Sequence, residues 1–233
     1  MKPEKFTENG YVFESGCFLS HTYLLLPETA GEGRAVVIDP WRCEALCEIL
    51  RRNAVSRLLV LLTHEHFDHT TGVNWLAERF ETQLICQDAC AESIAKVRCN
   101  RPLGIMGREE EMRIAKEIGL FTCKADRTFS GALVLPWDGR EILLTHTPGH
   151  TKGSCCICLD GLCFCGDSAL LDLPVITRLP GGSQAEYDEI TLSYLRSLPD
   201  TTCFLPGHGV RYQKGKAVFQ NGAFRLIKEE HHE

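Results

Sequence analysis

Residues 58–69 read Leu-Leu-Val-Leu-Leu-Thr-His-Glu-His-Phe-Asp-His, which is an aliphatic run followed by three histidines and one aspartate. The run Leu58–Leu62 is too short for a helix and suits a strand that is buried on both faces. The polar residues come directly after this strand, where turn-forming residues would be usual. Three imidazoles and a carboxylate within six residues have no ready structural explanation, so the segment indicates a metal site.

Three further polar residues follow predicted strands in the same way. They come after the apolar segments Ile142–Thr145, Cys163–Cys165 and Thr202–Leu205. Loops that leave the same edge of a layered sheet can converge, so we expect these residues to join the first cluster. The seven candidate ligands are His64, His66, Asp68, His69, His150, Asp167 and His208.

The residue types also fit a metal site. Imidazole and carboxylate are ligands that Zn²⁺, Fe²⁺ and Mn²⁺ accept. Positions i and i+2 of an extended loop project to one side, so His64 and His66 can hold one ion, while Asp68 and His69 serve a neighbouring one. Five histidines and two aspartates are what two four-coordinate ions need, if one carboxylate bridges and a hydroxide completes both.

Composition narrows the class of protein. The chain has 233 residues, 44% hydrophobic and 24% charged, which is typical of a globular protein. The net charge of −6 argues against a nucleic-acid-binding face. We expect neither a membrane span nor a secretion signal, and hence a cytoplasmic protein. The 13 cysteines are interpreted as free thiols buried as small apolar side chains, with a metal cluster as the alternative.

Strand and helix signals alternate along the chain, which predicts an α/β fold. One hairpin is predicted from Tyr23–Leu26 and Ala35–Ile38, and Asp160-Gly161 predicts a second. Helices are predicted from about Arg42, from Thr71, near Asp88, over Glu109–Ile118, after the capping box Ser183–Glu186, and after about Gly215.

The pattern His64-x-His66-x-Asp68-His69, followed in order by the three later ligands, resembles the metallo-β-lactamase-fold superfamily. The likeness runs from about Tyr11 to Gly209. Its flanking segments His146–Ser154, Leu179–Gly182 and Leu205–Gly209 are most similar to the glyoxalase II (hydroxyacylglutathione hydrolase) branch. The resemblance implies a four-layer αββα sandwich with the metals at one edge between the two sheets, which we expect to be a single domain over residues 1–233.

The resemblance also implies a division of the ligands. Metal 1 would be held by His64, His66 and His150, metal 2 by Asp68, His69 and His208, and Asp167 would bridge the two. Two departures concern the substrate. Only 25 residues follow His208, too few for the helical domain that helps glyoxalase II bind glutathione, and Val175–Arg178 replaces the usual Gly-Arg-x-Asp.

The predicted function is a dinuclear metal-dependent hydrolase, in which a metal-bridging hydroxide attacks the carbonyl of a thioester or related acyl compound. Asp68 and Asp167 are the predicted catalytic carboxylates. Zinc is the expected metal, and iron or manganese are compatible with the same ligands. Two divalent ions, two carboxylates and a hydroxide leave a charge near +1, which favours a small anionic or carbonyl-bearing substrate. No nucleic-acid or membrane partner is expected, and the oligomeric state stays open.

Alternative activities use the same ligands. A lactonase or phosphodiesterase of this fold would apply the same hydroxide to another electrophile. A mononuclear iron persulfide dioxygenase is the alternative from a different class. The loops Asn100–Arg127 and Leu171–Gly182 are where specificity is expected to lie.

Other polar residues receive lesser roles. Asp39 ends a strand and can orient a ligand imidazole. Glu65 and Phe67 are interpreted as spacers. The predicted helix near Thr71 points its N-terminus at the ligand loop and is expected to keep His69 neutral. Further assignments are His146 as a strand-end residue or an acid, His21 as structural, Cys165 as core, Lys152 and Arg178 as substrate contacts or surface charges, and His231 and His232 as belonging to no site.

Overall fold

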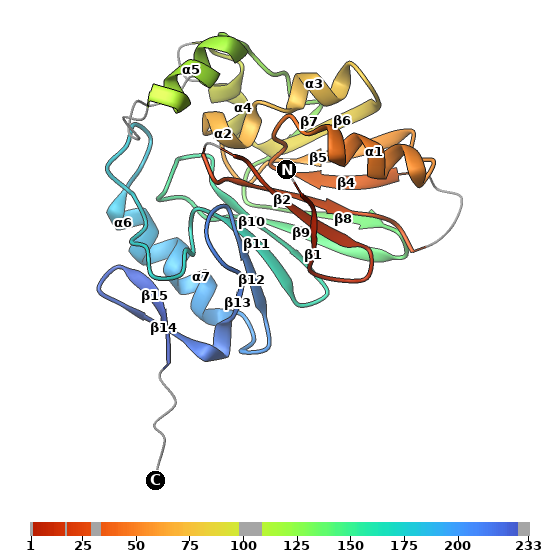
Figure 1. Cartoon of the computed structure of the whole chain (residues 1–233). Coiled ribbons are helices and arrows are strands. Elements are labelled where there is room, and N and C mark those ends of the chain that lie inside the picture. The colour runs from red at the N-terminus through yellow and green to blue at the C-terminus, as the bar shows by residue number, and fades with distance from the viewer. Residues whose placement is uncertain (1, 17, 29–33, 98–108, 228–233) are drawn as a thin grey trace.

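The computed structural model describes residues 2–16, 18–28, 34–97 and 109–227. Two large β-sheets stack face to face, and helices cover both outer faces (Figure 1). The predicted αββα sandwich is confirmed. None of the helices in the described ranges has the length and apolar character that a bilayer crossing requires.

The first sheet contains the first seven strands in chain order. Strands β1 to β4 are antiparallel, and β4 to β7 are parallel. The aliphatic run of β5 is buried on both faces, as the sequence predicts. The strands are β1 (Glu4–Lys5), β2 (Gly10–Glu14), β3 (His21–Leu25), β4 (Arg34–Ile38), β5 (Arg57–Leu61), β6 (Glu81–Gln87) and β7 (Arg127–Phe129).

The second sheet has six strands in the order β13-β12-β11-β10-β9-β8. All neighbours are antiparallel except β11 and β12, which run parallel. The predicted Asp160-Gly161 hairpin is confirmed and joins β10 to β11. The strands are β8 (Ala132–Trp137), β9 (Arg140–His146), β10 (Cys155–Leu159), β11 (Leu162–Gly166), β12 (Cys203–Pro206) and β13 (Tyr212–Gln213).

Helices lie on the two outer faces (Figure 1). The described helices on the side of the first sheet are α1 (Glu44–Arg52), α2 (Phe67–Thr70), α3 (Val73–Ala77), α4 (Asp88–Ile94) and α5 (Glu109–Ile118). A continuous helical stretch covers the second sheet and consists of α6 (Gln184–Glu186), the π-helical turn η1 (Tyr187–Thr191) and α7 (Leu192–Ser197). The predicted cap is present, because the Ser183 hydroxyl accepts a hydrogen bond from the Glu186 N–H.

The predicted C-terminal helix is wrong. After the short 3₁₀ turn η2 (Lys214–Lys216), the chain forms a hairpin of β14 (Ala217–Gln220) and β15 (Ala223–Leu226). Asn221 and Gly222 both have positive φ, which a two-residue type I′ turn requires. Asn-Gly is the strongest short hairpin signal, so the sequence held the evidence for this turn.

Three apolar layers hold the sandwich together. One cluster fills the space between the sheets, with Val36, Leu59 and Phe164 among its buried members. A second lies between the first sheet and helices α1, α3 and α4. A third lies between the second sheet, α7 and the C-terminal hairpin. The sheets are therefore fixed relative to each other, which fixes the loops at their edges.

Candidate metal centre

The seven predicted ligands meet at one edge of the sandwich. β5 of the first sheet leads into His64, whereas β9, β11 and β12 of the second sheet lead into the three later ligands. Residues as distant in the chain as His69 and His208, which are 139 positions apart, become neighbours. Asp68 and His69 do not lie in an extended loop as expected, because the chain turns directly into α2 at Phe67.

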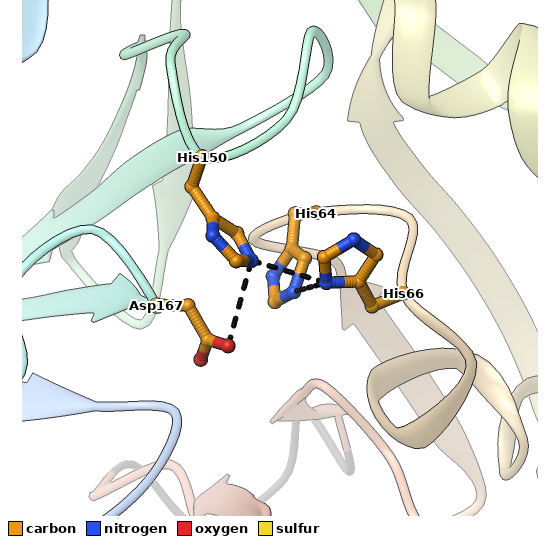
Figure 2. A group of neighbouring side chains, drawn as sticks. All are labelled: His64, His66, His150 and Asp167. Carbon is orange, nitrogen blue, oxygen red and sulfur yellow. Dashed lines mark hydrogen bonds and ion pairs between the residues drawn. The ribbon is translucent and has the colours of Figure 1, made fainter. Parts of the chain in front are cut away.

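Four side chains form the first group (Figure 2). His66 Nδ1 lies 3.1 Å from His64 Nε2 and 3.0 Å from His150 Nε2. Asp167 Oδ2 lies 3.5 Å from His150 Nε2. One nitrogen or oxygen from each residue falls within 4.8 Å of all the others, which is compact enough to hold a single ion.

A second group lies beside the first and contains Asp68, His69 and His208. Asp68 Oδ2 lies 3.4 Å from His69 Nε2 and 3.3 Å from His208 Nε2. The two imidazole Nε2 atoms are themselves 3.3 Å apart. Three ligand atoms from two distant parts of the chain therefore face one point.

Asp167 lies between the two groups. Its Oδ2 is 3.5 Å from His150 Nε2 in the first group and 3.6 Å from His208 Nε2 in the second. Its Oδ1 is 3.7 Å from His69 Nε2. This is the position that the resemblance implies for a bridging carboxylate.

The side chains fit a pair of divalent cations. Asp167 Oδ1 is buried and has no hydrogen-bond partner within the described ranges. A buried carboxylate oxygen without a partner is costly unless a cation satisfies it. The convergence of five imidazoles and two carboxylates supplies the nitrogen and oxygen donors that zinc, iron and manganese accept.

In four of the histidines, the ring nitrogen that points away from the two groups, Nδ1, lies within hydrogen-bonding distance of another residue. These contacts fix the orientation of each ring. A histidine ligand commonly makes such a contact through its second nitrogen. The Nδ1 contacts are Thr63 Oγ1 at 3.0 Å for His64, Asp39 Oδ2 at 3.1 Å for His69, the Ile176 carbonyl at 2.8 Å for His150 and the Leu19 carbonyl at 3.1 Å for His208. His66 is turned the other way and directs Nδ1 into the group.

Asp39 provides the orienting contact that the sequence suggested. Its Oδ1 accepts a 2.7 Å hydrogen bond from the Thr63 N–H, and its Oδ2 accepts from the Thr63 hydroxyl and faces His69 Nδ1. Asp39 also lies close enough to His64 and His69 to form a ligand group with them. Because its oxygens already have these partners, and because it lies on the Nδ1 side of His69, we interpret it as an orienting residue.

Burial separates the protonation states of the histidines. Burial lowers the pKa of His64 well below its usual range and that of His66 to about 3. Burial also lowers the pKa of His150. These three imidazoles are therefore neutral near pH 7, which is the form that binds a metal.

His69 behaves differently from the sequence prediction. Burial favours its neutral form, but the nearby Asp68 carboxylate and the contact with Asp39 outweigh burial and raise its pKa to about 10. The expectation that a helix N-terminus keeps His69 neutral is wrong for the metal-free protein. His69 is the third residue of a four-residue helix, where the positive end of the helix has less effect than two carboxylates.

Glu65 is not the spacer that the sequence suggested. Its side chain is buried, and its carboxylate accepts a 2.7 Å hydrogen bond from the Thr151 hydroxyl. Thr151 follows His150, so the bond links two of the loops that carry the first group. Nothing in the local sequence pattern distinguishes this role, because the partner lies 86 positions away.

Phe67 is also more than a spacer. It is buried in an aromatic cluster with Phe18 and Trp41. This cluster lies beneath α5, whose residues Ile114 and Ile118 pack against it. The α2 turn that carries Asp68 and His69 is thereby anchored by its intervening side chain.

Other predicted residues occupy simpler positions. His146 Nε2 lies 3.0 Å from the Lys152 carbonyl oxygen, in keeping with a structural strand-end role. His21 is buried with Nδ1 2.9 Å from the Pro206 carbonyl, which supports the segment before His208. Cys165 is core, as predicted. Lys152 and Arg178 are exposed, and His231 and His232 lie outside the described residues.

Two glycines allow the loops to approach the centre closely. A Cβ at Gly207 would meet Asp167 Oδ1 and lie 2.8 Å from His69 Cε1. Gly166 has φ of +50° and lies against the Thr63 side chain. Glycine is thus required at both positions by space, and at Gly166 also by backbone conformation.

Comparison with known proteins agrees with this architecture. Residues 15–208 match the sequence model of the metallo-β-lactamase superfamily. The chain therefore belongs to the metallo-β-lactamase superfamily. The structure of the BLEG-1 B3 metallo-β-lactamase superposes with a TM-score of 0.71 at 24% identity, covering 88% of this chain and 94% of that one. ETHE1 from Myxococcus xanthus superposes with a TM-score of 0.65 at 20% identity, covering 93% and 81%.

Two sequence relatives are matched at lower than 30% identity. Hydroxyacylglutathione hydrolase of Chromohalobacter salexigens is 28% identical over 190 residues, which cover 80% of this chain and 61% of that relative. An uncharacterised protein of Mycobacterium bovis is 26% identical over 212 residues, which cover 84% and 89%. This chain thus spans less than two thirds of the hydrolase relative.

Proposed function

We propose that the two side-chain groups hold two divalent metal ions and that the protein is a metal-dependent hydrolase of thioesters. The observation that carries this proposal is the position of Asp167. Its Oδ2 lies 3.5 Å from a ligand nitrogen of the first group and 3.6 Å from one of the second, so a single carboxylate reaches both. A site for one ion could use Asp167 as a ligand, but it would not need a carboxylate that also reaches His208 of the second group.

We assign one ion to each of the two groups of neighbouring side chains. His64, His66 and His150 would hold one ion, Asp68, His69 and His208 the other, and Asp167 both. Ions bound there would lower the pKa of a water molecule and polarise a substrate carbonyl. Zinc is the proposed metal, and iron and manganese suit the same donors.

The residues of the chain set the charge of the site. The histidine neighbours lower the pKa of Asp68 and that of Asp167 against the opposing effect of burial, so both carboxylates are ionised near pH 7. Two negative charges do not neutralise two divalent ions, and the site keeps a net positive charge. This favours a small anionic or carbonyl-bearing substrate, although the whole protein carries a charge of −6.

A thioester suits this site because its leaving group needs little protonation. The acid candidate from the sequence, His146, has its Nε2 3.0 Å from the Lys152 carbonyl, and it belongs to neither ligand group. A thiolate can depart without a proton from such a group, whereas an amine or alkoxide needs one. The likeness to a hydroxyacylglutathione hydrolase supports the same substrate class.

The test combines metal analysis with a substrate panel. The purified protein should hold two equivalents of metal per chain and hydrolyse glutathione or coenzyme A thioesters faster than lactones or phosphodiesters. Chelation should abolish the activity, and added zinc should restore it. His66→Ala should lose both activity and metal, whereas His146→Ala, a matched histidine at the same edge, should keep both.

Other results would reject the proposal in distinct ways. One equivalent of iron with oxygen uptake on a persulfide would assign a dioxygenase. Two equivalents of metal with cleavage of phosphodiesters alone would keep the metal centre and reject the thioester. Full activity of His66→Ala under limiting metal would remove the ligand assignment itself.

A further inference from the structure

The β10–β11 hairpin carries four cysteines on one face. Cys156 and Cys158 alternate along β10, and Cys163 and Cys165 alternate along β11. All four pack in the cluster between the second sheet and α7. All are free thiols. Cys155 faces the other way, into the layer between the sheets, and takes no part in this group.

Cys158 and Cys163 are opposite each other across the two strands. Asp160 and Gly161 form the two-residue turn, both with positive φ, and Leu159 pairs with Leu162 next to it. The pair that closes such a turn is hydrogen-bonded, so the next pair, Cys158 and Cys163, is the non-hydrogen-bonded kind. Such pairs have Cα atoms about 4.5 Å apart, within the range that a disulfide spans.

The two thiols have unequal surroundings. Cys163 is fully buried, whereas Cys158 is only partly buried, and its Sγ lies 3.4 Å from the Tyr194 hydroxyl of α7. Hydrogen bonds from Cys163 and Tyr194 lower the pKa of Cys158, although burial opposes this. Hydrogen bonds with Cys156 and Cys158, together with burial, raise the pKa of Cys163 well above its usual range. Cys158 is thus the better nucleophile and Cys163 the protonated partner behind it.

A soft-metal site is a poor explanation for these thiols. The ligand atoms of the four cysteines do not form a compact group of three or more anywhere in the described ranges, whereas the histidines and aspartates at the sheet edge do. A directly opposed pair is instead the arrangement in which two thiols can join.

We propose that Cys158 and Cys163 are a modification site at which a hydroperoxide is reduced and the two thiols become a disulfide. In the first step the Cys158 sulfur attacks one peroxide oxygen, the S–O bond forms, the O–O bond breaks, and an alcohol or water leaves with the thiol proton. In the second step the Cys163 sulfur displaces hydroxide from the sulfenic acid, and water leaves with the Cys163 proton. Two thiols and one hydroperoxide give one disulfide, one alcohol and one water.

The experiment uses the reduced, zinc-loaded protein, since zinc does not itself react with peroxide by electron transfer. After treatment with one equivalent of hydrogen peroxide and alkylation of the remaining thiols, the protein is cleaved before aspartate residues. Cleavage before Asp160 separates Cys158 from Cys163. We expect the two fragments to remain linked until a reductant is added, with two thiols lost per chain.

Variants identify the partners. Cys158→Ser and Cys163→Ala should each abolish the linked fragments, while Cys203→Ser, which removes another partly buried thiol, should leave them unchanged. In Cys163→Ala, Cys158 should proceed to the sulfinic acid at higher peroxide, a product that the wild type avoids. Tyr194→Phe, which keeps the ring, should slow the reaction about fivefold, the effect of one hydrogen bond.

Three outcomes would overturn the proposal. Linked fragments that persist in Cys158→Ser would assign the disulfide to another pair. Sulfinic acid at Cys158 in the wild type, formed as readily as in Cys163→Ala, would show that Cys163 does not capture the intermediate. No loss of thiols at a tenfold excess of peroxide would show that Cys158 is unreactive.

Discussion

The Thr151 hydroxyl donates a 2.7 Å hydrogen bond to the buried Glu65 carboxylate, across 86 positions of sequence. Glu65 lies between two predicted ligands, and Thr151 follows a third. The Thr151 hydroxyl also lies 2.9 Å from that of Ser154, so the contact is part of a small buried network. The relationship fixes the distance between the two loops on which the first metal group depends.

Removal of this contact should loosen the first metal group. Glu65→Ala removes the carboxylate that accepts from the Thr151 hydroxyl and leaves that hydroxyl only its contact with Ser154. The loss of a hydrogen bond to a charged group costs about 1.5–3 kcal/mol of stability. We expect metal affinity to fall about tenfold, as is usual for groups that support a ligand. Glu65→Gln keeps an acceptor oxygen and should retain most of the affinity. Chelator competition and thermal unfolding measure both effects, and wild-type values for Glu65→Ala would contradict this role.

Asp39 offers a test of the orienting contact. In Asp39→Asn the side chain can still accept from the Thr63 N–H, but His69 Nδ1 loses its carboxylate partner. Metal affinity at the second group should fall about 10- to 100-fold. Asp188→Asn, the same substitution on an exposed helical residue, is the control. Unchanged zinc affinity of Asp39→Asn in chelator competition would mean that His69 does not need this carboxylate.

Protonation should oppose metal binding at the second group alone. The pKa of His69 is raised to about 10, chiefly by Asp68 against the effect of burial, and the pKa of His208 is raised by Asp167 and Asp68 against the same effect. A raised pKa means that the proton is bound below it, so His69 is charged at pH 7 in the metal-free protein. Metal binding must release this proton, and apparent affinity should rise with pH.

Nitrogen-15 NMR of the histidine rings at pH 7 measures this directly. In the metal-free protein His69 should be charged, while His64 and His66, whose pKa values burial lowers, should be neutral. Added zinc should convert His69 to the neutral form. Two results would contradict the release of a proton from His69. One is a neutral His69 before zinc is added, and the other is a zinc affinity that does not change between about pH 6 and pH 8.

The sequence predicts the α/β class and the convergence of the seven polar side chains at one sheet edge, because both follow from local signals. The aliphatic run of β5 and the ligand residues directly after it need no knowledge of the rest of the chain. The αββα layering follows from the resemblance, and the two stacked sheets and the family match confirm it. The single domain over residues 1–233 and the two-metal ligand set stay predictions until domain boundaries and metal content are measured.

Other features depend on contacts that no local pattern contains. Glu65 could be interpreted only as a spacer, because Thr151 becomes its neighbour through the packing of two sheets. The charge state of His69 depends on Asp39 and Asp68 together, and only Asp68 is adjacent in sequence. By contrast, the C-terminal hairpin does have a local signal, because its turn is Asn221-Gly222.

Gly207 provides the most specific test of the assembled centre. A methyl group there would meet Asp167 Oδ1 and the His69 ring, so the Gly207→Ala chain must displace the carboxylate that reaches both groups. We expect the loss of at least one metal equivalent. The rate of hydrolysis should fall about 10-fold or more, because a misplaced catalytic group lowers the rate by factors of this order. Gly131→Ala is the matched control, because nothing lies within 4 Å of its added Cβ. If Gly207→Ala binds two equivalents of zinc and hydrolyses thioesters at the rate of Gly131→Ala, Asp167 does not hold both ions.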